Sequence, residues 1–405
     1  MPEHDFDQEI VGQGTNSVKW EFRVEDGVPR QWDRANPELG DDQVLPMWVA
    51  DMDFQVAQPI INALQARVAH GVFGYARATE RYGEAIRGWM EARQGWQPQP
   101  EWMVWTPGVV PALHLIVREF TKSGEKVLIQ RPVYHPFAFC AERNQRVPIS
   151  NSLLFKNGQY QMDYEDLEEK ARQRDVTLAI VCSPHNPVGR VWNADELNRF
   201  AEICVRHGVL MVLDEIHGDL IMPGHRFVPF GSLNSAYVDH AIICTSPSKS
   251  FNLAGLHSSN LFISNEVIRE RFQTQLQATA VTGMNPLSIA ATQAAYESGG
   301  EWLDGAISYI FANLNHLDNH LRAHLPDIRL IHPQGTYLAW LDCRALRLND
   351  DALSQLLMDE ARIYTDVGHI FGPEGSGFCR INVACPRSVL NRALQRLTDA
   401  VAKRQ

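Results

Sequence analysis

The chain lacks the marks of several large classes of protein. It has no excess of basic residues, since 37 Lys and Arg stand against 48 Asp and Glu and give a formal net charge of −11. This balance argues against nucleic acid or an anionic membrane as partner, although it leaves room for a local basic patch. No apolar run is long enough to cross a bilayer. The first ten residues, MPEHDFDQEI, are acidic and contain no apolar stretch, so we expect no signal peptide.

Cysteine is scarce and scattered. The seven cysteines form no Cys-x-x-Cys pair, their number is odd, and several lie in apolar runs typical of strands. A disulfide framework or a zinc site would show paired, closely spaced cysteines. We therefore expect reduced thiols in the core of a cytoplasmic protein, and we predict no metal site. The seven are Cys140, Cys182, Cys204, Cys244, Cys343, Cys379 and Cys385.

The composition is that of a globular protein, with 45% hydrophobic and 21% charged residues. Its 405 residues are too many for one ordinary compact domain. From about residue 100, apolar runs rich in Val, Ile and Leu alternate with longer amphipathic stretches. The apolar runs contain few polar residues, which is typical of strands buried on both faces. We predict strands at 103–106, 126–130, 177–182, 208–214, 240–245 and 260–264.

Helical patterns lie between these strands. Asn193 precedes one of them, and the acids that follow it make it a good N-cap residue. Alternating strands and helices predict an α/β fold with a mostly parallel sheet flanked by helices. The helices are expected at about 111–122, 135–145, 163–174, 194–207 and 265–278.

The pattern changes after residue 300. A long helical stretch at about 301–324 leads to short apolar segments and to a last helix that begins near residue 387. This part predicts a smaller α+β domain, and we assign the first 50 residues to it because they show few regular elements. The predicted domains are therefore a large one at 55–300 and a small one at 1–54 and 301–405.

Polar residues follow the predicted strands at the points where the strands end. In open α/β sheets, ligands gather beyond the carboxyl ends of the strands. Five strand ends present a helix N-terminus, a ring, an amide, a carboxylate and an amine to one crevice. These groups belong to Gly108–Val110, Tyr134, Asn186, Asp214 and Lys249.

Together these groups indicate one kind of ligand. A helix N-terminus beside hydroxyl groups, here those of Ser246 and Ser248, binds phosphate through free N–H groups. A carboxylate can hold a protonated ring nitrogen by a charge-assisted bond. A lysine in a partly dry pocket can lose its proton and form an imine with an aldehyde. Phosphate, ring nitrogen and aldehyde together describe pyridoxal 5′-phosphate (PLP).

Nine segments carry a resemblance to a known family. The chain resembles the fold-type-I PLP-dependent transferase fold of the class I/II aminotransferase superfamily. Within it, the chain is similar to the cystathionine β-lyase (C–S lyase) group of the MalY/PatB type. The order of the segments and their span over nearly the whole chain carry the resemblance. The segments are LPMWVADMDF 45–54, GVFGYARAT 71–79, TPGVVPAL 106–113, RPVYHPF 131–137, CSPHNPVGRVW 182–192, LDEIHGDLI 213–221, SPSKSFNLAGL 246–256, PQGTYLAWLD 333–342 and GFCRINVACPR 377–387.

The resemblance implies roles at the cofactor ring. Lys249 would be the catalytic residue that carries the imine with PLP and moves the Cα proton of the substrate. Asp214 would contact the pyridine nitrogen, Asn186 the ring oxygen and Tyr134 the ring face. His217 would also lie in the cofactor site, where many aminotransferases of the superfamily carry a tyrosine.

The resemblance also implies phosphate and substrate contacts. The phosphate would be held by the N–H groups of Val109 and Val110 and by the hydroxyls of Ser246 and Ser248. Tyr75 would reach the phosphate and the substrate from the other subunit of a homodimer. Arg380 would bind the α-carboxylate of the substrate, and Ala50 would line the same site.

Each residue also has a purely structural interpretation. Lys249 could be a solvated surface cation, and Asp214 could cap the turn that follows its strand. Asn186 could only form a turn, as Asn-Pro often does, and Tyr134 could belong to the core. Arg380 lies in an apolar strand, where a buried arginine needs a partner, so it could pair with an internal acid. For His217, the structural interpretation stays open.

Two reactions use the same residues. A PLP-dependent β-lyase would cleave L-cystathionine or related cysteine S-conjugates to a thiol, pyruvate and ammonia, whereas an aminotransferase would release a keto acid. The resemblance favours the lyase and links it to methionine biosynthesis. A third hypothesis is a regulatory binding partner with residual lyase activity. The lysine, aspartate and arginine would be hard to explain in a chain that had abandoned catalysis.

Overall fold

The structure is a computed structural model that describes residues 4–25, 28–31 and 44–404. The first three residues of the acidic N-terminal stretch therefore lie outside the described residues. The chain divides into two compact units. The large unit comprises residues 56–305 and 334–336, and the small unit comprises residues 1–55, 306–333 and 337–405. The domain boundaries predicted from the sequence lie within a few residues of these, but the pattern does not reveal that 334–336 joins the large unit.

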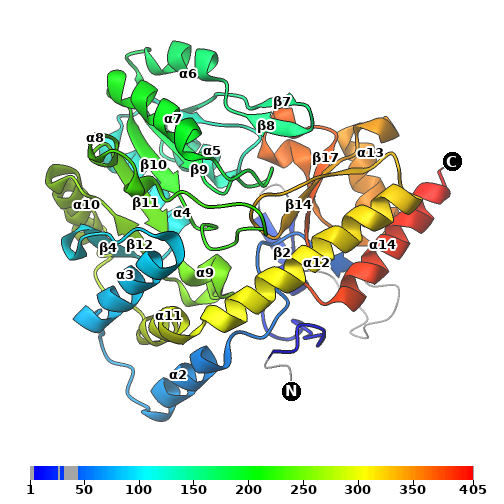
Figure 1. Ribbon diagram of the computed structural model, residues 1–405, viewed down its shortest axis with the longest axis horizontal. Coiled ribbons are helices and arrows are strands. Elements are labelled where there is room, and N and C mark those ends of the chain that lie inside the picture. The colour runs from blue at the N-terminus through cyan, green and yellow to red at the C-terminus, as the bar shows by residue number, and fades with distance from the viewer. Residues whose placement is uncertain (1–3, 26–27, 32–43, 405) are drawn as a thin grey trace. The chain divides into compact units, whose positions relative to one another are not determined.

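A seven-stranded sheet forms the centre of the large unit (Figure 1). Its strands follow the order β4-β12-β11-β10-β9-β5-β6. The pairs among β11, β10, β9, β5 and β6 are parallel, while β12 runs antiparallel to both β11 and β4. The strands are β4 Met103–Thr106, β5 Lys126–Ile129, β6 Val147–Ser150, β9 Val176–Cys182, β10 Leu210–Asp214, β11 Ala241–Thr245 and β12 Ser259–Phe262.

Helices cover both faces of this sheet. Alternate strand residues such as Ile180 and Val212 join one hydrophobic cluster with α4 (Val109–Phe120), α5 (Pro136–Glu142) and α10 (Glu266–Ala278). The intervening residues, such as Val181 and Leu213, are also fully buried. They point to the other face, where three further helices contact β9, β10 and β11. Those helices are α6 Tyr164–Ala171, α7 Ala194–Arg206 and α8 Ser235–Val238.

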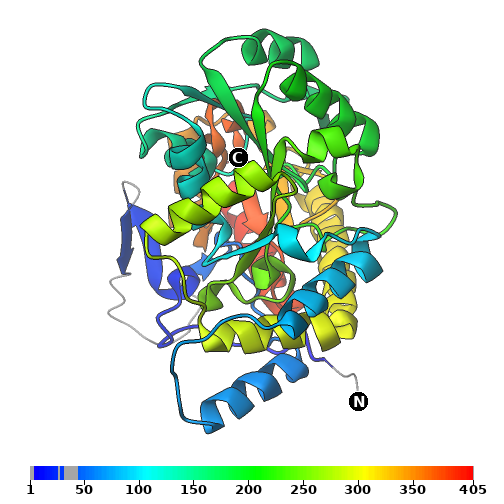
Figure 2. The same ribbon diagram turned by 90° about the vertical axis from the view of Figure 1, so that its left-hand side faces the viewer.

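Three more helices extend the large unit away from the sheet. Figures 1 and 2 both show α2 (Gln58–Ala69) lying beside α11 (Pro286–Ser298), which also contacts α3 (Glu80–Gln94). The segment between α2 and α3 carries Tyr75. The short helix α9 (Pro247–Ser250) and the hairpin of β7 (Leu154–Lys156) and β8 (Gln159–Gln161) complete the large unit.

The small unit is built around a four-stranded antiparallel sheet of order β13-β14-β17-β16. A parallel pair, β3 and β15, joins the N-terminal segment to the C-terminal part of the chain. Helix α12 (Gly300–His324), which begins in the large unit, is linked to α14 by side-chain hydrogen bonds such as His316 Nε2 to Asn391 Oδ1, 2.6 Å. The other elements are α1 Val18–Glu21, β1 Phe22–Glu25, β2 Val28–Gln31, β3 Leu45–Pro46, β13 Arg329–Ile331, β14 Leu338–Asp342, α13 Asp350–Gln355, β15 Ile363–Tyr364, β16 Asp366–Val367, β17 Phe378–Asn382 and α14 Arg387–Ala402.

These elements confirm the predicted α/β fold class with a mostly parallel sheet. All seven cysteines are buried free thiols, as expected. Within the described residues, no helix combines the length and apolar character needed to cross a membrane, and no group of His, Cys, Asp and Glu side chains could hold a metal ion.

Candidate cofactor and substrate sites

Three adjacent parallel strands end side by side at the centre of the large sheet. Asp214, the last residue of β10, lies opposite Cys182 of β9 and Cys244 of β11. The loops that leave these strands carry Asn186 and Lys249. The strand register therefore brings three of the predicted site residues to one edge of the sheet, as expected for a ligand site in a parallel sheet.

Asp214 is a buried carboxylate with few hydrogen-bond donors around it. It is 3% exposed, and one carboxylate oxygen accepts the Ile216 N–H at 3.1 Å. Burial raises the pKa of Asp214 to about 6, while the Ile216 N–H and the nearby charge of Lys249 act in the opposite direction. A buried carboxylate of this kind is stabilised by a cation, so the site suits a protonated ring nitrogen.

Lys249 lies on α9, the short helix that follows β11. Its neighbour Ser250 donates its hydroxyl to Asp219 Oδ2 at 2.8 Å. The other oxygen of Asp219 accepts from Trp89 Nε1 and Gln94 Nε2, both at 3.0 Å. Asp219 thus fixes α9 to helix α3. Asp219 could not be identified from the sequence, because its partners come from segments more than 30 residues away.

The predicted phosphate ligands follow two strands, β4 and β11, that are separated in the sheet by a single strand. Helix α4 follows β4, and Ser246 follows β11, while β12 lies between these two strands. The hydroxyls of Thr106 and Ser259 are 2.6 Å apart and join β4 to β12. The hydroxyl of Ser246 donates to the Ser258 carbonyl at 2.6 Å. Because β12 runs antiparallel to both β4 and β11, these two strands point in the same direction. The N-terminus of α4 and the serine loop therefore lie at the same edge of the sheet, beyond the carboxyl ends of β4 and β11.

The N-terminus of α4 is suited to an anion. Its N-cap residue is Gly108, at φ 152°, which offers no capping side chain. Val109 and Val110 occupy the first helical positions, and Pro111 has no N–H group. The first N–H groups of a helix have no acceptor inside the helix, so those of Val109 and Val110 can bind phosphate oxygens. With the serine hydroxyls, Asp214 and Lys249, these donors fit PLP.

Asn186 and Tyr134 lie in two loops that are joined by a backbone hydrogen bond, and His217 is buried shortly after Asp214 in the chain. The Tyr134 N–H donates to the Asn186 carbonyl at 3.0 Å, so the two loops are held together. His217 is 2% exposed and follows Asp214 by three residues. Tyr134 also packs against the hydrophobic cluster of the sheet. The cofactor roles of these three residues stay predictions.

Arg380 and Ala50 belong to the small unit. Arg380 is 4% exposed, and its Nη2 forms an ion pair with Asp366 and donates to the Trp48 carbonyl at 2.8 Å. The Phe371 ring lies 4.9 Å from its guanidinium carbon. Asp366 is therefore the internal acid that a buried arginine needs, and no local sequence pattern identifies it. The Ala50 carbonyl accepts from the Tyr337 hydroxyl at 2.9 Å.

Tyr75 lies apart from the other predicted residues of the large unit. Its side chain is fully exposed, and Val72 and Phe73 beside it are more than half exposed. Within one chain, this segment between α2 and α3 is joined to the rest of the unit by a bridge between Ala76 and Met284. The structure therefore does not bring Tyr75 to the α4 N-terminus of its own chain.

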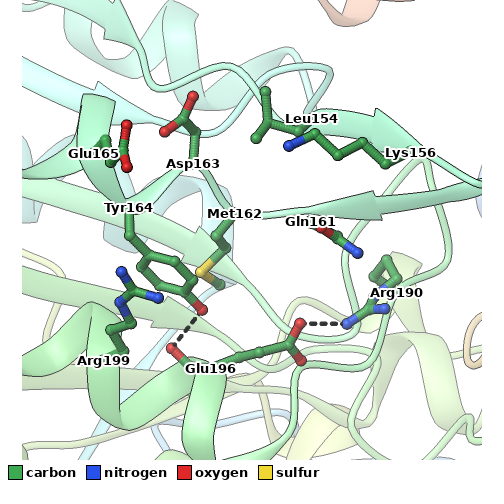
Figure 3. A pocket seen from close by; sticks show the side chains of 10 residues that line it. All are labelled: Leu154, Lys156, Gln161, Met162, Asp163, Tyr164, Glu165, Arg190, Glu196 and Arg199. Carbon is green, nitrogen blue, oxygen red and sulfur yellow. Dashed lines mark hydrogen bonds and ion pairs between the residues drawn. The ribbon is translucent and has the colours of Figure 1, made fainter.

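A separate cavity of about 570 Å³ lies between the β7–β8 hairpin, α6 and α7 (Figure 3). None of the predicted site residues lines it. Arg190 and Glu196 form an ion pair of 2.6 Å across it, and the Tyr164 hydroxyl donates to the Glu196 carbonyl at 3.2 Å. Arg199 stacks on the Tyr164 ring at 4.2 Å. Two of its charged side chains, those of Arg190 and Glu196, thus pair with each other.

Comparisons with known proteins identify the family of the chain. The family model "Aminotransferase class I and II" matches residues 45–397. The chain is 40% identical to cystathionine β-lyase PatB of Bacillus subtilis, over 98% of this chain and 100% of that protein. It is 34% identical to the protein MalY of Escherichia coli, over 92% and 95% of the two chains. Among solved structures, PLP-containing cystalysin of Treponema denticola matches with a TM-score of 0.93 and 38% identity, over 99% and 100% of the two chains.

Proposed function

Since the chain belongs to the class I and II aminotransferase family, we propose that it is a PLP-dependent carbon–sulfur β-lyase. It cleaves L-cystathionine or related cysteine S-conjugates to a thiol, pyruvate and ammonia. The observation that carries this proposal is the 40% identity, over 98% of the chain, to a relative named cystathionine β-lyase. The buried carboxylate of Asp214 and the half-buried amine of Lys249, on neighbouring strand ends, provide the chemistry that such a reaction needs.

Lys249, Asp214 and Arg380 have separate roles in the proposed reaction. Lys249 would hold the cofactor as an imine, and its free amine would be the base that takes the Cα proton of the substrate. When bound, PLP would supply the electron sink that makes this proton acidic enough to remove. Asp214 keeps the ring nitrogen protonated, and burial makes it a strong partner for that cation. Arg380 binds the α-carboxylate, and the Cβ–S bond then breaks to release the thiolate.

The proposal also includes the oligomeric state of the enzyme, its class of substrate and the pathway in which it acts. The active unit is a homodimer in which Tyr75 of each chain serves the site of its partner. The substrate is a small sulfur amino acid, and release of homocysteine places the reaction in methionine biosynthesis in the cytoplasm. The exposed apolar segment around Tyr75 supports the dimer, because monomers rarely expose contiguous apolar surface without a use for it.

Turnover without a second substrate tests the proposal. The lyase needs no keto acid, because elimination returns the cofactor to Lys249 in every cycle. We therefore expect L-cystathionine alone to yield pyruvate, ammonia and homocysteine over many turnovers. An aminotransferase would stop after one turnover, with its cofactor left as pyridoxamine phosphate. That arrest would reject the lyase and favour the aminotransferase.

Borohydride reduction tests the cofactor site independently of turnover. The reduced protein should carry PLP on Lys249 alone, as mapped by peptide mass spectrometry, whereas Lys249→Ala should carry none covalently. Label on another lysine would contradict the assignment of Lys249.

A further inference from the structure

The segment Met47–Asp51 has an unusual pattern of hydrogen bonds. It belongs to no helix or strand, yet all five of its carbonyl oxygens accept hydrogen bonds from other parts of the small unit. The donors, in order, are Asn382 N at 2.9 Å, Arg380 Nη2 at 2.8 Å, Asn382 Nδ2 at 2.7 Å, the Tyr337 hydroxyl at 2.9 Å and, for Asp51, Asn382 Nδ2 at 2.6 Å with Lys19 Nζ at 3.4 Å. Irregular backbone held at every carbonyl is fixed in one conformation.

Asn382 makes three of these six bonds. It is 1% exposed, and its amide nitrogen spans the turn between the carbonyls of Val49 and Asp51. Its Oδ1 accepts the Ala384 N–H at 2.8 Å. An asparagine amide offers two N–H donors, and here both bind the same segment. Removal of this side chain would take this donor from the Val49 carbonyl and leave the Asp51 carbonyl with only the 3.4 Å bond from Lys19 Nζ.

Arg380 and Asn382 act on the segment from the same strand. They lie two residues apart on β17, so their side chains point to one face of the sheet. Arg380 contacts the Trp48 carbonyl directly. The position of the guanidinium relative to the Met47–Asp51 backbone is therefore set by one short piece of strand, with Asp366 on the neighbouring strand β16 opposite Arg380.

We propose that Asn382 is a positioning residue for recognition of the α-carboxylate of the substrate. It fixes the Met47–Asp51 backbone and thereby keeps Arg380 in the orientation that receives a carboxylate. This inference rests on the proposed role of Arg380 in the lyase. Asn382 itself contacts no ligand. Its loss weakens binding of ligands that carry a carboxylate but not of ligands that lack one.

The chain offers a matched control in Asn313. This asparagine on α12 is also fully buried in the small unit. Its Nδ2 likewise donates to two carbonyls, those of Val383 at 2.9 Å and Cys385 at 2.8 Å. Its bonds hold the chain after β17 and none of them reaches Met47–Asp51. Asn313→Ala and Asn382→Ala therefore remove equivalent bonds and differ in the segment that they release.

The experiment compares two ligands that differ only in the carboxylate. L-Alanine and ethylamine are titrated into the PLP-loaded protein, and binding is followed by the change in cofactor absorbance. We expect Asn382→Ala to weaken L-alanine binding roughly ten-fold while ethylamine binding changes less than about two-fold. Asn313→Ala should change neither by more than about two-fold. Hydrogen exchange of the peptide that contains residues 47–51 should accelerate in Asn382→Ala alone.

Two further variants keep the test decisive. Tyr337→Phe removes only the hydroxyl that binds the Ala50 carbonyl, and it should give a smaller effect of the same kind if Asn382→Ala does not fold. Arg380→Lys tests the premise. If Arg380→Lys leaves L-alanine binding unchanged, the proposed role of Arg380 fails. If it weakens L-alanine while Asn382→Ala and Tyr337→Phe behave like Asn313→Ala, the positioning role alone is overturned.

Discussion

At the scale of single residues, Glu215 shows how burial alone alters a carboxyl group. Its side chain is buried directly after Asp214, and one oxygen accepts the Phe230 N–H at 2.7 Å. Burial raises the pKa of Glu215 to about 8, partly offset by that N–H. The folded protein therefore keeps a proton on Glu215 at pH values where the unfolded chain, with a usual pKa of 4.5, has lost it.

The first prediction follows from the sign of this difference. Since the folded state binds the extra proton, Glu215 lowers the free energy of unfolding as pH rises from about 4.5 to about 8, by up to roughly 5 kcal/mol. Glu215→Gln keeps an oxygen for the Phe230 N–H and does not titrate. In urea unfolding at pH 5 and pH 8, the variant should therefore gain stability relative to wild type at the higher pH. An equal difference at both pH values would contradict the buried, protonated state.

Arg380 gives the second prediction. Arg380→Lys keeps the charge beside Asp366 but loses the planar two-point contact with a carboxylate. A charge-assisted contact contributes roughly 1.5–3 kcal/mol, so kcat/KM for L-cystathionine should fall by about ten- to a hundred-fold. Most of the loss should be in KM, with kcat lowered too if the contact also orients the Cα–H bond. Unchanged kinetics would show that Arg380 serves only its ion pair with Asp366.

The site residues that could be predicted from sequence share one feature. Asp214, Asn186 and Lys249 follow apolar strands directly, so local pattern predicts their place at the strand ends. Asp219, Asp366 and Asn382 act through partners that are distant in the chain. A single sequence carries no signal for such pairs, because their contacts form only when the tertiary structure does.

At the scale of secondary structure, the prediction succeeded where the chain is buried on both faces. The predicted strand at 103–106 coincides with β4, and 177–182 differs from β9 by one residue. Strand β6 was missed because this edge strand is short and partly exposed, so it lacks a continuous apolar run. The predicted N-cap Asn193 forms a complete capping box with Glu196.

The helical pattern alone predicts a start at about residue 111, whereas the assignment of Gly108–Val110 as a helix N-terminus agrees with the observed start of α4 at Val109. Pro111 taken alone suggests that the helix starts at residue 111. The backbone conformation of Gly108 allows the helix to begin two residues earlier. At φ 152° and ψ 158°, Gly108 occupies a region that only glycine adopts readily. This glycine therefore sets the position of the two N–H groups proposed to bind phosphate.

The third prediction tests this glycine. In Gly108→Ala, the new Cβ would meet Pro111 Cδ at 3.3 Å and the backbone would be strained. The free energy of unfolding should fall by about 1–3 kcal/mol, and the Kd for PLP should rise roughly ten-fold because the phosphate donors shift. Gly95→Ala is the control, since Gly95 also has positive φ, at 71°, and lies at the end of α3 with open space around it. It should lose stability without a change in PLP affinity, as measured by titration of the apo-protein.

At the scale of the whole molecule, the large unit leaves an apolar stretch uncovered. Val68, Val72 and Phe73 are each more than half exposed, and Tyr75 is fully exposed. Four exposed apolar or aromatic side chains within eight residues are typical of a protein interface rather than of free surface. A two-fold dimer is the commonest closed assembly, and it would cover this stretch on both chains at once.

The last prediction asks whether the two chains share their sites. If Tyr75 serves the partner, a heterodimer of a Lys249→Ala chain with a Tyr75→Phe chain has one site with both defects and one site with neither. Random exchange of equal amounts makes half of the dimers mixed, so activity should recover to roughly a quarter of wild type. A mixture of Lys249→Ala with Arg380→Lys is the control, because both residues would serve the site of their own chain, and it should show no recovery. If mass spectrometry shows that chains exchange and the Tyr75→Phe mixture still gains nothing over its separate components, each site is complete within one chain and Tyr75 has no role across the dimer.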